Sequence, residues 1–358
     1  TSEVSFCTQS NKINGKHLIL NLYKDSPAYT AGLKIGDQLT AIDGIPIIEL
    51  SDEQVGRLMK GQSGSSIFVE VSRQGKLIVI ETTREKINIP NISYTNMLNE
   101  EVGYLRLSEF RNDAAKDVQE AAQNLKDKGA SKLIIDLRGN PGGLLLESVD
   151  ICNLFIPKGS KVVDTKGKLK VQSKTYSTKN DPFDLSIPIA VLIDKNSASA
   201  SEIVSGVIQD YDRGVIIGQK SFGKGLVQVS KKLVYNSQLK VTIAKYYTPS
   251  GRCIQALDYS NRKTDGTVGK MADSLKTEFR TTNNRKVFDG AGVDPDLDVP
   301  VPPKSSFTKN LEKSMLIYDY ANLYYYAHDT IASAKEFRLS DQEYESFMSW
   351  MSEQDFEN

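Results

Sequence analysis

The hydrophobic and polar positions of the first 86 residues alternate as they do in half-buried strands. HLILNLY (17–23) alternates in this way, and SSIFVEVSRQGKLIVIETTRE (65–85) predicts a β-hairpin that turns at Gln74-Gly75. Between them, DEQVGRLMKG (52–61) has the three- and four-residue spacing of a short helix. We therefore expect residues 1–86 to form a small β-rich domain.

After residue 86 the pattern changes to strands and helices in alternation, which is typical of an α/β fold. KLIIDL (132–137) and IAVLID (189–194) are apolar runs, as expected of buried strands. NDAAKDVQEAAQNLKDKGA (112–130) and residues 144–155 have helical spacing. Residues 87–304 are thus predicted to form a second, α/β domain.

Beyond residue 305 the chain is helical and amphipathic, with aromatic residues at helical spacing. Ser340 and Glu343 have the spacing of a capping box, which predicts the start of a last helix. A tail of this kind more often provides packing surface than a ligand site. We expect residues 305–358 to cover the core or to make a homo-oligomer contact.

Composition argues against several classes of protein. Lys and Arg number 45, as do Asp and Glu, so the formal net charge is zero, whereas a nucleic-acid-binding protein normally carries a basic excess. The seven lysines from Lys158 to Lys179 are predicted to form the solvated face of a hairpin rather than an anion site. Cys7, Cys152 and Cys253 match no metal-ligand spacing, and Cys152 is predicted to be a buried apolar residue.

Targeting segments are not evident in the sequence. No apolar segment approaches the ~18 residues needed to cross a membrane, and no signal peptide is recognisable. The chain begins at Thr1 without methionine, so we expect a processed or trimmed form of the protein. Its N-terminus then carries no information about where the protein is sent.

The serine-rich stretch over residues 193–229 is the part of the chain best suited to chemistry. Ser199 follows the strand IAVLID and opens a helical pattern, so its hydroxyl is expected at a helix N-terminus among unpaired backbone N–H groups. A serine becomes a strong nucleophile when a base removes its proton, and the usual base is histidine. Both histidines, His17 and His328, lie far away in the sequence, which makes a lysine the other candidate.

Lys224 lies between two glycines in FGKGLVQ, which allows its backbone to approach a neighbour closely. In general, a lysine acts as a base near neutral pH only where burial lowers its pKa from ~10.4 by roughly three units. The residues on either side of this lysine carry no charge. If GKGLVQV is one strand, Lys224 and Gln228 project from the same face and the Gln228 amide could orient the amine. The alternative is a solvated lysine in a turn.

The two segments SASASEIVSGVIQDYDRG and IIGQKSFGKGLVQ together resemble the serine–lysine signature of the carboxy-terminal processing proteases, also called tail-specific proteases. The resemblance implies a serine endopeptidase in which Ser199 is the nucleophile, Lys224 is the general base and Gln228 holds the lysine. It also implies that the α/β domain is a crotonase-like core, and it implies no metal or other cofactor.

A glycine-containing loop, RGNPGG (138–143), directly follows the strand KLIIDL, and its glycines and proline predict a sharp turn. Exposed N–H groups in such a loop can hold the oxyanion of acyl transfer, and the alternative is a tight strand–helix connection. DLRGNPGG is similar to the corresponding element of the protease family. The resemblance implies an oxyanion hole in which Gly142 or Gly143 acts together with the Ala200 N–H.

The N-terminal domain resembles the PDZ domains of these proteases through SPAYTAGLKIGDQLTAIDG and MKGQSGSSIFVEVSR. A PDZ domain binds the C-terminal carboxylate of a peptide with the N–H groups of a loop, and the peptide extends its sheet. The resemblance implies protein substrates with apolar C-terminal tails and a periplasmic or otherwise exported location. The expected loop position, Thr1–Phe6, lacks the family's glycines. Binding of the carboxylate there must therefore use the backbone N–H groups of other residues, or it is weakened.

Asp210 completes a set of Ser, Lys and Asp that suggests a catalytic triad. Eleven positions (210 − 199) of one predicted helix separate it from Ser199, which is about 16 Å along the axis at about 1.5 Å per residue. A direct contact is thereby excluded. We expect Asp210 to hold Arg213 or to cap a loop.

Three other interpretations fit parts of the sequence. A PDZ-based adaptor with an inactive core is one, and the intact Ser199, Lys224 and Gln228 argue against it. A crotonase-like acyl-transfer enzyme acting on a thioester is another, and the attached peptide-binding domain argues against it. A third is a protease in a resting form, with Lys224 out of reach until a tail or partner binds, which the sequence does not distinguish from an active one.

Overall fold

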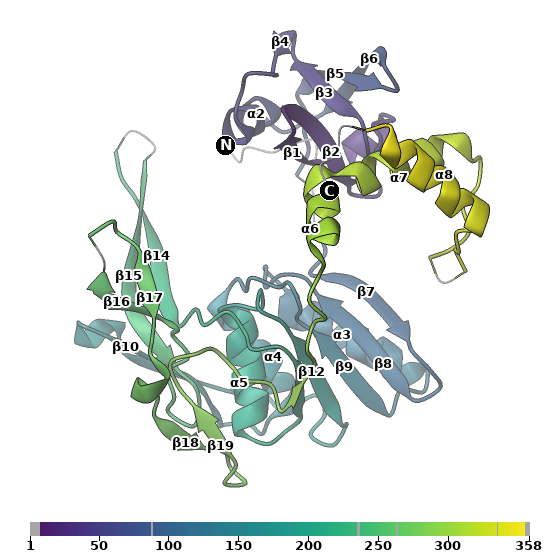
Figure 1. Ribbon diagram of the computed structural model, residues 1–358. Helices are drawn as coiled ribbons and strands as arrows, with labels where there is room; N and C mark the ends of the chain where they lie inside the picture. The colour runs from purple at the N-terminus through teal and green to yellow at the C-terminus, as the bar shows by residue number, and fades with distance from the viewer. Residues whose placement is uncertain (1–7, 87–88, 235–236, 263, 335, 355–358) are drawn as a thin grey trace. The chain divides into compact units, whose positions relative to one another are not determined.

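The computed structural model describes residues 8–86, 89–234, 237–262, 264–334 and 336–354. Its contacts divide the chain into two compact units, which Figure 1 draws in sequence colours. The terminal unit consists of Thr1–Ile89 together with Pro302–Asn358, and the central unit consists of Pro90–Val301. The boundaries predicted at residues 86 and 304 stay predictions, while the contacts group the helical tail with the N-terminal residues. The predicted PDZ loop at Thr1–Phe6 lies outside the described residues.

The terminal unit contains a six-stranded sheet with the order β1-β2-β3-β5-β6, and β4 pairs with β3. The hairpin predicted at Gln74-Gly75 is confirmed, because β5 and β6 pair along their whole length. Ile67, Val69 and Val71 alternate toward the core of this unit, as the sequence pattern predicted. The elements are β1 (Thr8–Ile13), β2 (Lys16–Leu22), α1 (Pro27–Thr30), β3 (Gln38–Ile42), β4 (Ile45–Pro46), α2 (Asp52–Met59), β5 (Ser66–Arg73) and β6 (Lys76–Thr83).

The C-terminal tail adds three helices to this unit: α6 (Ser306–Ser314), α7 (Leu316–Ala327) and α8 (Asp341–Ser352). The predicted capping box is confirmed at the start of α8, where the Ser340 N–H donates to Glu343 at 2.7 Å and the Glu343 N–H donates to Ser340 Oγ at 3.3 Å. Helix α7 contacts β2, because the Tyr318 hydroxyl donates to the carbonyl of Ile19 at 2.6 Å. The tail is therefore a packing element of the terminal unit.

The central unit is built on a second six-stranded sheet, with the order β20-β13-β12-β9-β8-β7. Strands β8, β9, β12, β13 and β20 are parallel neighbours, and β7 pairs antiparallel at one edge. This arrangement is the α/β pattern expected from the sequence. The strands are β7 (Ile92–Met97), β8 (Val102–Leu107), β9 (Lys132–Asp136), β12 (Ile189–Ile193), β13 (Val215–Gly218) and β20 (Leu297–Asp298).

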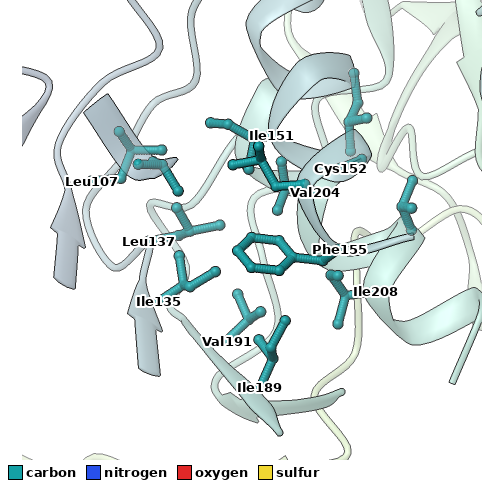
Figure 2. Close-up of a cluster of buried hydrophobic side chains, with 14 of the residues drawn as sticks. Leu107, Ile135, Leu137, Ile151, Cys152, Phe155, Ile189, Val191, Val204 and Ile208 are labelled. Atoms are coloured by element: carbon teal, nitrogen blue, oxygen red, sulfur yellow. The ribbon is translucent and has the colours of Figure 1, made fainter. Parts of the chain in front are cut away.

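Three helices pack on this sheet: α3 (Ala114–Asp127), α4 (Leu145–Phe155) and α5 (Ala200–Asp210). Figure 2 shows side chains from β9 and β12, such as Ile135 and Val191, facing Phe155 and Ile208 of the helices. Cys152 is fully buried in this cluster, as predicted. Burial on this scale fixes the helices against the sheet, which in turn fixes the loops at the strand ends.

A four-stranded antiparallel sheet, ordered β11-β10-β15-β14, forms the rest of the central unit with two small hairpins. The polar segment after residue 256 contains the paired strands β16 and β17. None of the helices within the described residues is long and apolar enough to span a membrane. The remaining strands are β10 (Lys161–Gly167), β11 (Lys174–Ser177), β14 (Leu226–Lys232), β15 (Gln238–Tyr247), β16 (Leu257–Arg262), β17 (Val268–Lys270), β18 (Glu278–Arg280) and β19 (Lys286–Phe288).

Removing the Phe155 side chain is expected to destabilise the central unit strongly. Phe155 is 1% exposed at the centre of the cluster, so Phe155→Ala leaves a cavity and should lower the free energy of unfolding by about 3–5 kcal/mol. Leu146→Ala on the same helix is the control, because Leu146 is 62% exposed and its loss should change stability by less than about 0.5 kcal/mol. Urea unfolding followed by circular dichroism measures both, and equal effects would contradict this account of the core.

Candidate active site

Three loops that carry the predicted site residues leave the C-terminal ends of neighbouring parallel strands. The glycine loop follows β9, the turn to Ser199 follows β12, and the loop to Lys224 follows β13. Parallel neighbours end at the same edge of a sheet, which is where α/β proteins usually place their sites. The topology therefore brings together segments that lie far apart in the sequence.

Ser199 occupies the turn between β12 and α5 in an unusual backbone conformation, with φ 57° and ψ −112°. A non-glycine residue held in such a region stores roughly 1–3 kcal/mol of strain and keeps it only when its surroundings determine the conformation. A strained serine between a strand and a helix is also the geometry that exposes the nucleophile of other hydrolases. Ser199 is partly exposed, whereas every residue of α5 is buried.

The other serines of the run hold the loops together. The Ser197 hydroxyl donates to the carbonyl of Leu137 at 2.8 Å, and the Ser201 hydroxyl donates to the carbonyl of Asn140 at 3.0 Å. Both serines are fully buried, which leaves Ser199 as the partly exposed member of the three. Ser197 and Ser201 therefore have structural roles, and Ser199 between them is the accessible serine.

The glycine loop lies directly against this turn. A Cβ on Gly142 would come within 2.8 Å of both the Ala200 nitrogen and Ser199 Cβ, so only glycine fits there. The Gly142 N–H itself donates to the buried Asn140 side chain at 2.9 Å. In the described part of the chain, the N–H groups of Gly143 and Ala200 donate no hydrogen bond, and Gly143 is exposed. Of the two predicted glycine donors, Gly143 is the one left free in this structure.

The backbone of the Gly223-Lys224-Gly225 triplet is held on every side. Gly223 and Lys224 donate their N–H groups to Glu202, and Gly225 donates to the Gln255 side chain at 2.8 Å. Their three carbonyls accept, in order, from the Ala256 N–H, the Tyr246 hydroxyl and the Tyr246 N–H. All six backbone polar groups are therefore paired. The flanking glycines are required because a Cβ on Gly223 would lie 2.3 Å from that of Ala256.

Glu202 connects the serine turn to the lysine loop. Its Oε2 accepts the N–H groups of Ser199 and Lys224, both at 2.8 Å, and its Oε1 accepts the Ser221 hydroxyl and the Gly223 N–H, both at 2.6 Å. The side chain is fully buried. Burial raises the pKa of Glu202, and the four donors oppose that rise because they favour the carboxylate.

Among the described residues no hydrogen bond joins Gln228 to Lys224. Strand β14 begins at Leu226, after the lysine, and its register shifts between Val227 and Gln228. The strict alternation assumed from GKGLVQV therefore does not extend from Lys224 to Gln228. The Gln228 amide is exposed and donates to Thr242 Oγ1 at 3.4 Å, so its predicted role of holding the lysine stays a prediction.

Asp210 is structural, and of its two predicted roles the structure shows the capping of a loop and not a pair with Arg213. Its carboxylate forms a buried ion pair with Arg252 at 2.9 Å and accepts the Ser250 N–H at 2.9 Å. Arg213 instead donates to the carbonyls of Phe155 and Asp184. Asp210 therefore caps the turn at Pro249-Ser250-Gly251, and local sequence proximity suggested Arg213 where the fold brings in Arg252.

Sequence reasoning missed the residues that position the site, chiefly Glu202, Tyr246 and Asn140. One signal was available: Ser199 and Glu202 have the S-x-x-E spacing of a capping box. For Tyr246 no local signal exists, because its partners Ser199 and Lys224 lie in other loops. Within the described residues no group of three His, Cys, Asp or Glu side chains is placed to hold a metal ion.

Comparisons with known proteins agree with this architecture. Residues 101–260 match the profile of peptidase family S41, residues 18–73 that of a PDZ domain, and residues 307–358 that of the C-terminal helical domain of PDZ-proteases. The chain therefore belongs to peptidase family S41, and it joins the S41 region to a PDZ domain and a C-terminal helical domain.

Curated relatives carry names of the same kind. A protein described as a CtpA-like serine protease from Staphylococcus aureus is 32% identical over 254 residues, which are 70% of this chain and 50% of that protein. A carboxyl-terminal-processing protease from Synechocystis sp. is 37% identical over 237 residues, which are 65% of this chain and 55% of the relative. The chain thus spans about half the length of the curated relatives it matches.

A solved structure of a photosystem II D1 C-terminal processing protease is also similar to this chain. The sequence identity is 24%, the match covers 83% of this chain and 72% of the other, and the TM-score is 0.46.

Replacing Glu202 with glutamine should damage both the site and the fold. The amide NH₂ cannot accept the N–H groups that one carboxylate oxygen now accepts, so Glu202→Gln should cost about 2–5 kcal/mol of stability. If Ser199 and Lys224 are the catalytic dyad that the sequence predicts, their displacement should also lower kcat roughly 100-fold for a peptide substrate. Glu120→Gln, at an exposed ion pair on α3, is the control and should leave both values unchanged. A Glu202→Gln protein with the stability and rate of the wild type would refute this role.

Proposed function

We propose that the central unit is a serine endopeptidase with Ser199 as nucleophile and Lys224 as general base. One observation carries the proposal: a strained serine at a helix N-terminus and a lysine from another loop have their backbone N–H groups on one carboxylate. Membership of peptidase family S41 supports it. The sheet and helices of this unit are proposed to be a crotonase-like core.

Acyl transfer would proceed in two half-reactions. Ser199 Oγ attacks the carbonyl carbon of the scissile peptide while the unprotonated amine of Lys224 accepts the hydroxyl proton. The lysine then gives this proton to the leaving amine as the C–N bond breaks, which leaves an ester on Ser199. A water molecule attacks the ester with the same lysine as base, which releases the new carboxyl end and restores the serine.

The oxyanion of each tetrahedral intermediate would be held by the N–H groups of Gly143 and Ala200. Both donors are free of partners within the described residues, and Ala200 is the first residue of α5, so the helix dipole adds to their effect. The Gly142 N–H, engaged by Asn140, is proposed to shape the loop instead.

The arrangement of Lys224 suggests a resting form of the site. Among the described residues no hydrogen bond joins Ser199 Oγ to Lys224 Nζ, and Gln228 is bound to Thr242. Because the lysine backbone is held at every polar group, activation is proposed to proceed by rotation of its flexible side chain and of the Gln228 amide. We propose that substrate or tail binding drives this rotation.

The substrates are proposed to be proteins with apolar C-terminal tails. The chain carries a PDZ domain, a module that binds peptide C-termini, and one curated relative is described as a carboxyl-terminal-processing protease. An exported location and homo-oligomer formation through the terminal helices are further parts of this proposal, both taken from the resemblance to the protease family.

Substitutions of the dyad test the chemistry. Ser199→Ala, Lys224→Ala and Lys224→Arg should each lower the cleavage of an unfolded protein with an apolar C-terminus by at least about 1,000-fold, because arginine keeps the charge but cannot act as a base. Lys232→Ala, at an exposed position on β14, is the control and should cleave normally. Normal cleavage by Ser199→Ala would refute the assignment. If the wild-type protein cleaves the substrate no faster than a sample without protein, the PDZ-based adaptor is favoured.

Blocking the substrate's C-terminus tests tail recognition separately. Amidation removes the carboxylate that a PDZ domain binds, so the amidated form of the same substrate should be cleaved with a kcat/KM at least about 10-fold lower. Initial rates over a range of substrate concentrations give this ratio for wild-type protein. Equal rates for the two substrates would remove the tail-recognition claim and leave the Ser199–Lys224 chemistry intact.

A further inference from the structure

Tyr246 touches the backbone of both predicted dyad residues. It lies near the end of β15, and its side chain is 2% exposed within the core of the central unit. Its hydroxyl contacts the carbonyl of Ser199 at 3.1 Å and the carbonyl of Lys224 at 2.5 Å. These two carbonyls belong to loops that follow different strands, β12 and β13.

We infer that Tyr246 is a positioning residue, whose hydroxyl holds the serine turn and the lysine loop in register for acyl transfer. The inference rests on the proposed peptidase function and adds a residue to it. One hydroxyl can share its proton between two carbonyl oxygens, so a single side chain fixes the separation of the two backbones.

The contact to Lys224 is the more consequential of the two. The Ser199 carbonyl also accepts from the N–H groups of Glu202 and Ile203 in the first turn of α5. Within the described residues, the Lys224 carbonyl has Tyr246 as its donor. Loss of the hydroxyl therefore removes the protein donor of a partly buried carbonyl, and the lysine peptide is expected to turn toward another donor.

Tyr246 and Glu202 bind different backbone groups of Ser199 and Lys224. Glu202 accepts the N–H groups of Ser199 and Lys224, and Tyr246 donates to their carbonyls. Burial and the nearby Glu202 charge raise the pKa of Tyr246 well above its ordinary value, which keeps the phenol protonated and able to donate. The two side chains together determine the position of each backbone segment.

The test compares Tyr246→Phe with Tyr247→Phe. The first keeps the ring in the core and removes only the hydroxyl, and the second removes a hydroxyl from the next residue, whose ring lies 4.4 Å from Lys166 Nζ. Peptide hydrolysis is measured at a temperature at which circular dichroism finds both proteins folded. We expect Tyr246→Phe to lower kcat roughly 10- to 100-fold with KM within about twofold, and Tyr247→Phe to change neither.

Two further readouts separate positioning from a general structural effect. A merely structural loss scales kcat down equally at every pH, whereas displacement of the base shifts the acid limb of the pH–rate profile. 4-Aminophenylalanine at position 246, which retains a donor at the ring's para position, should restore most of kcat, and this variant also decides the question if Tyr246→Phe fails to fold. A wild-type kcat for Tyr246→Phe, or a loss that the amino variant does not restore, overturns the inference.

Ser199→Ala, assayed beside these variants, shows which claim has failed. If Ser199→Ala cleaves like the wild type, the proposed function is wrong. If Ser199→Ala is inactive and Tyr246→Phe is unimpaired, the role of Tyr246 alone is wrong.

Discussion

The buried carboxylate of Glu202 is the interaction on which the site depends. Removing a carboxylate from water costs several kcal/mol, and each hydrogen bond to a charged group returns about 1.5–3 kcal/mol, so this anion is tolerated only while its four donors stay in place. Three of these donors are backbone N–H groups of Ser199, Gly223 and Lys224. Separation of the serine turn from the lysine loop would leave the buried charge with only the Ser199 N–H of its four donors, so the fold itself opposes it.

The same constraint divides the site into rigid and movable parts. The backbones of Ser199 and Lys224 are fixed by Glu202 and Tyr246, and the glycines beside the lysine allow the close approach that those contacts need. The side chain of Lys224 and the amide of Gln228 are left free of such restraint. Under the proposed function, the change between the resting and the competent arrangement would take place in these two side chains.

Much of the framework could be predicted from the sequence because it depends on local patterns. Strand β9, helix α5 and the position of Ser199 between strand and helix follow from hydrophobic spacing, and the α8 capping box from two residues. The partners of Asp210 and Lys224 could not be predicted, because Arg252 and Tyr246 come from other elements. The shifted register at Gln228 was missed for a related reason, since a bulge depends on the neighbouring strand.

The most direct test of the central claim is detection of the covalent intermediate. Wild-type protein is mixed with a peptide ester, quenched in acid within seconds and digested for mass spectrometry. The account predicts the acyl group on the peptide that contains Ser199, and its absence from the Lys224→Ala protein under the same conditions. An acyl group on another residue, or equal acylation of Ser199 without the lysine, would contradict a serine nucleophile activated by Lys224.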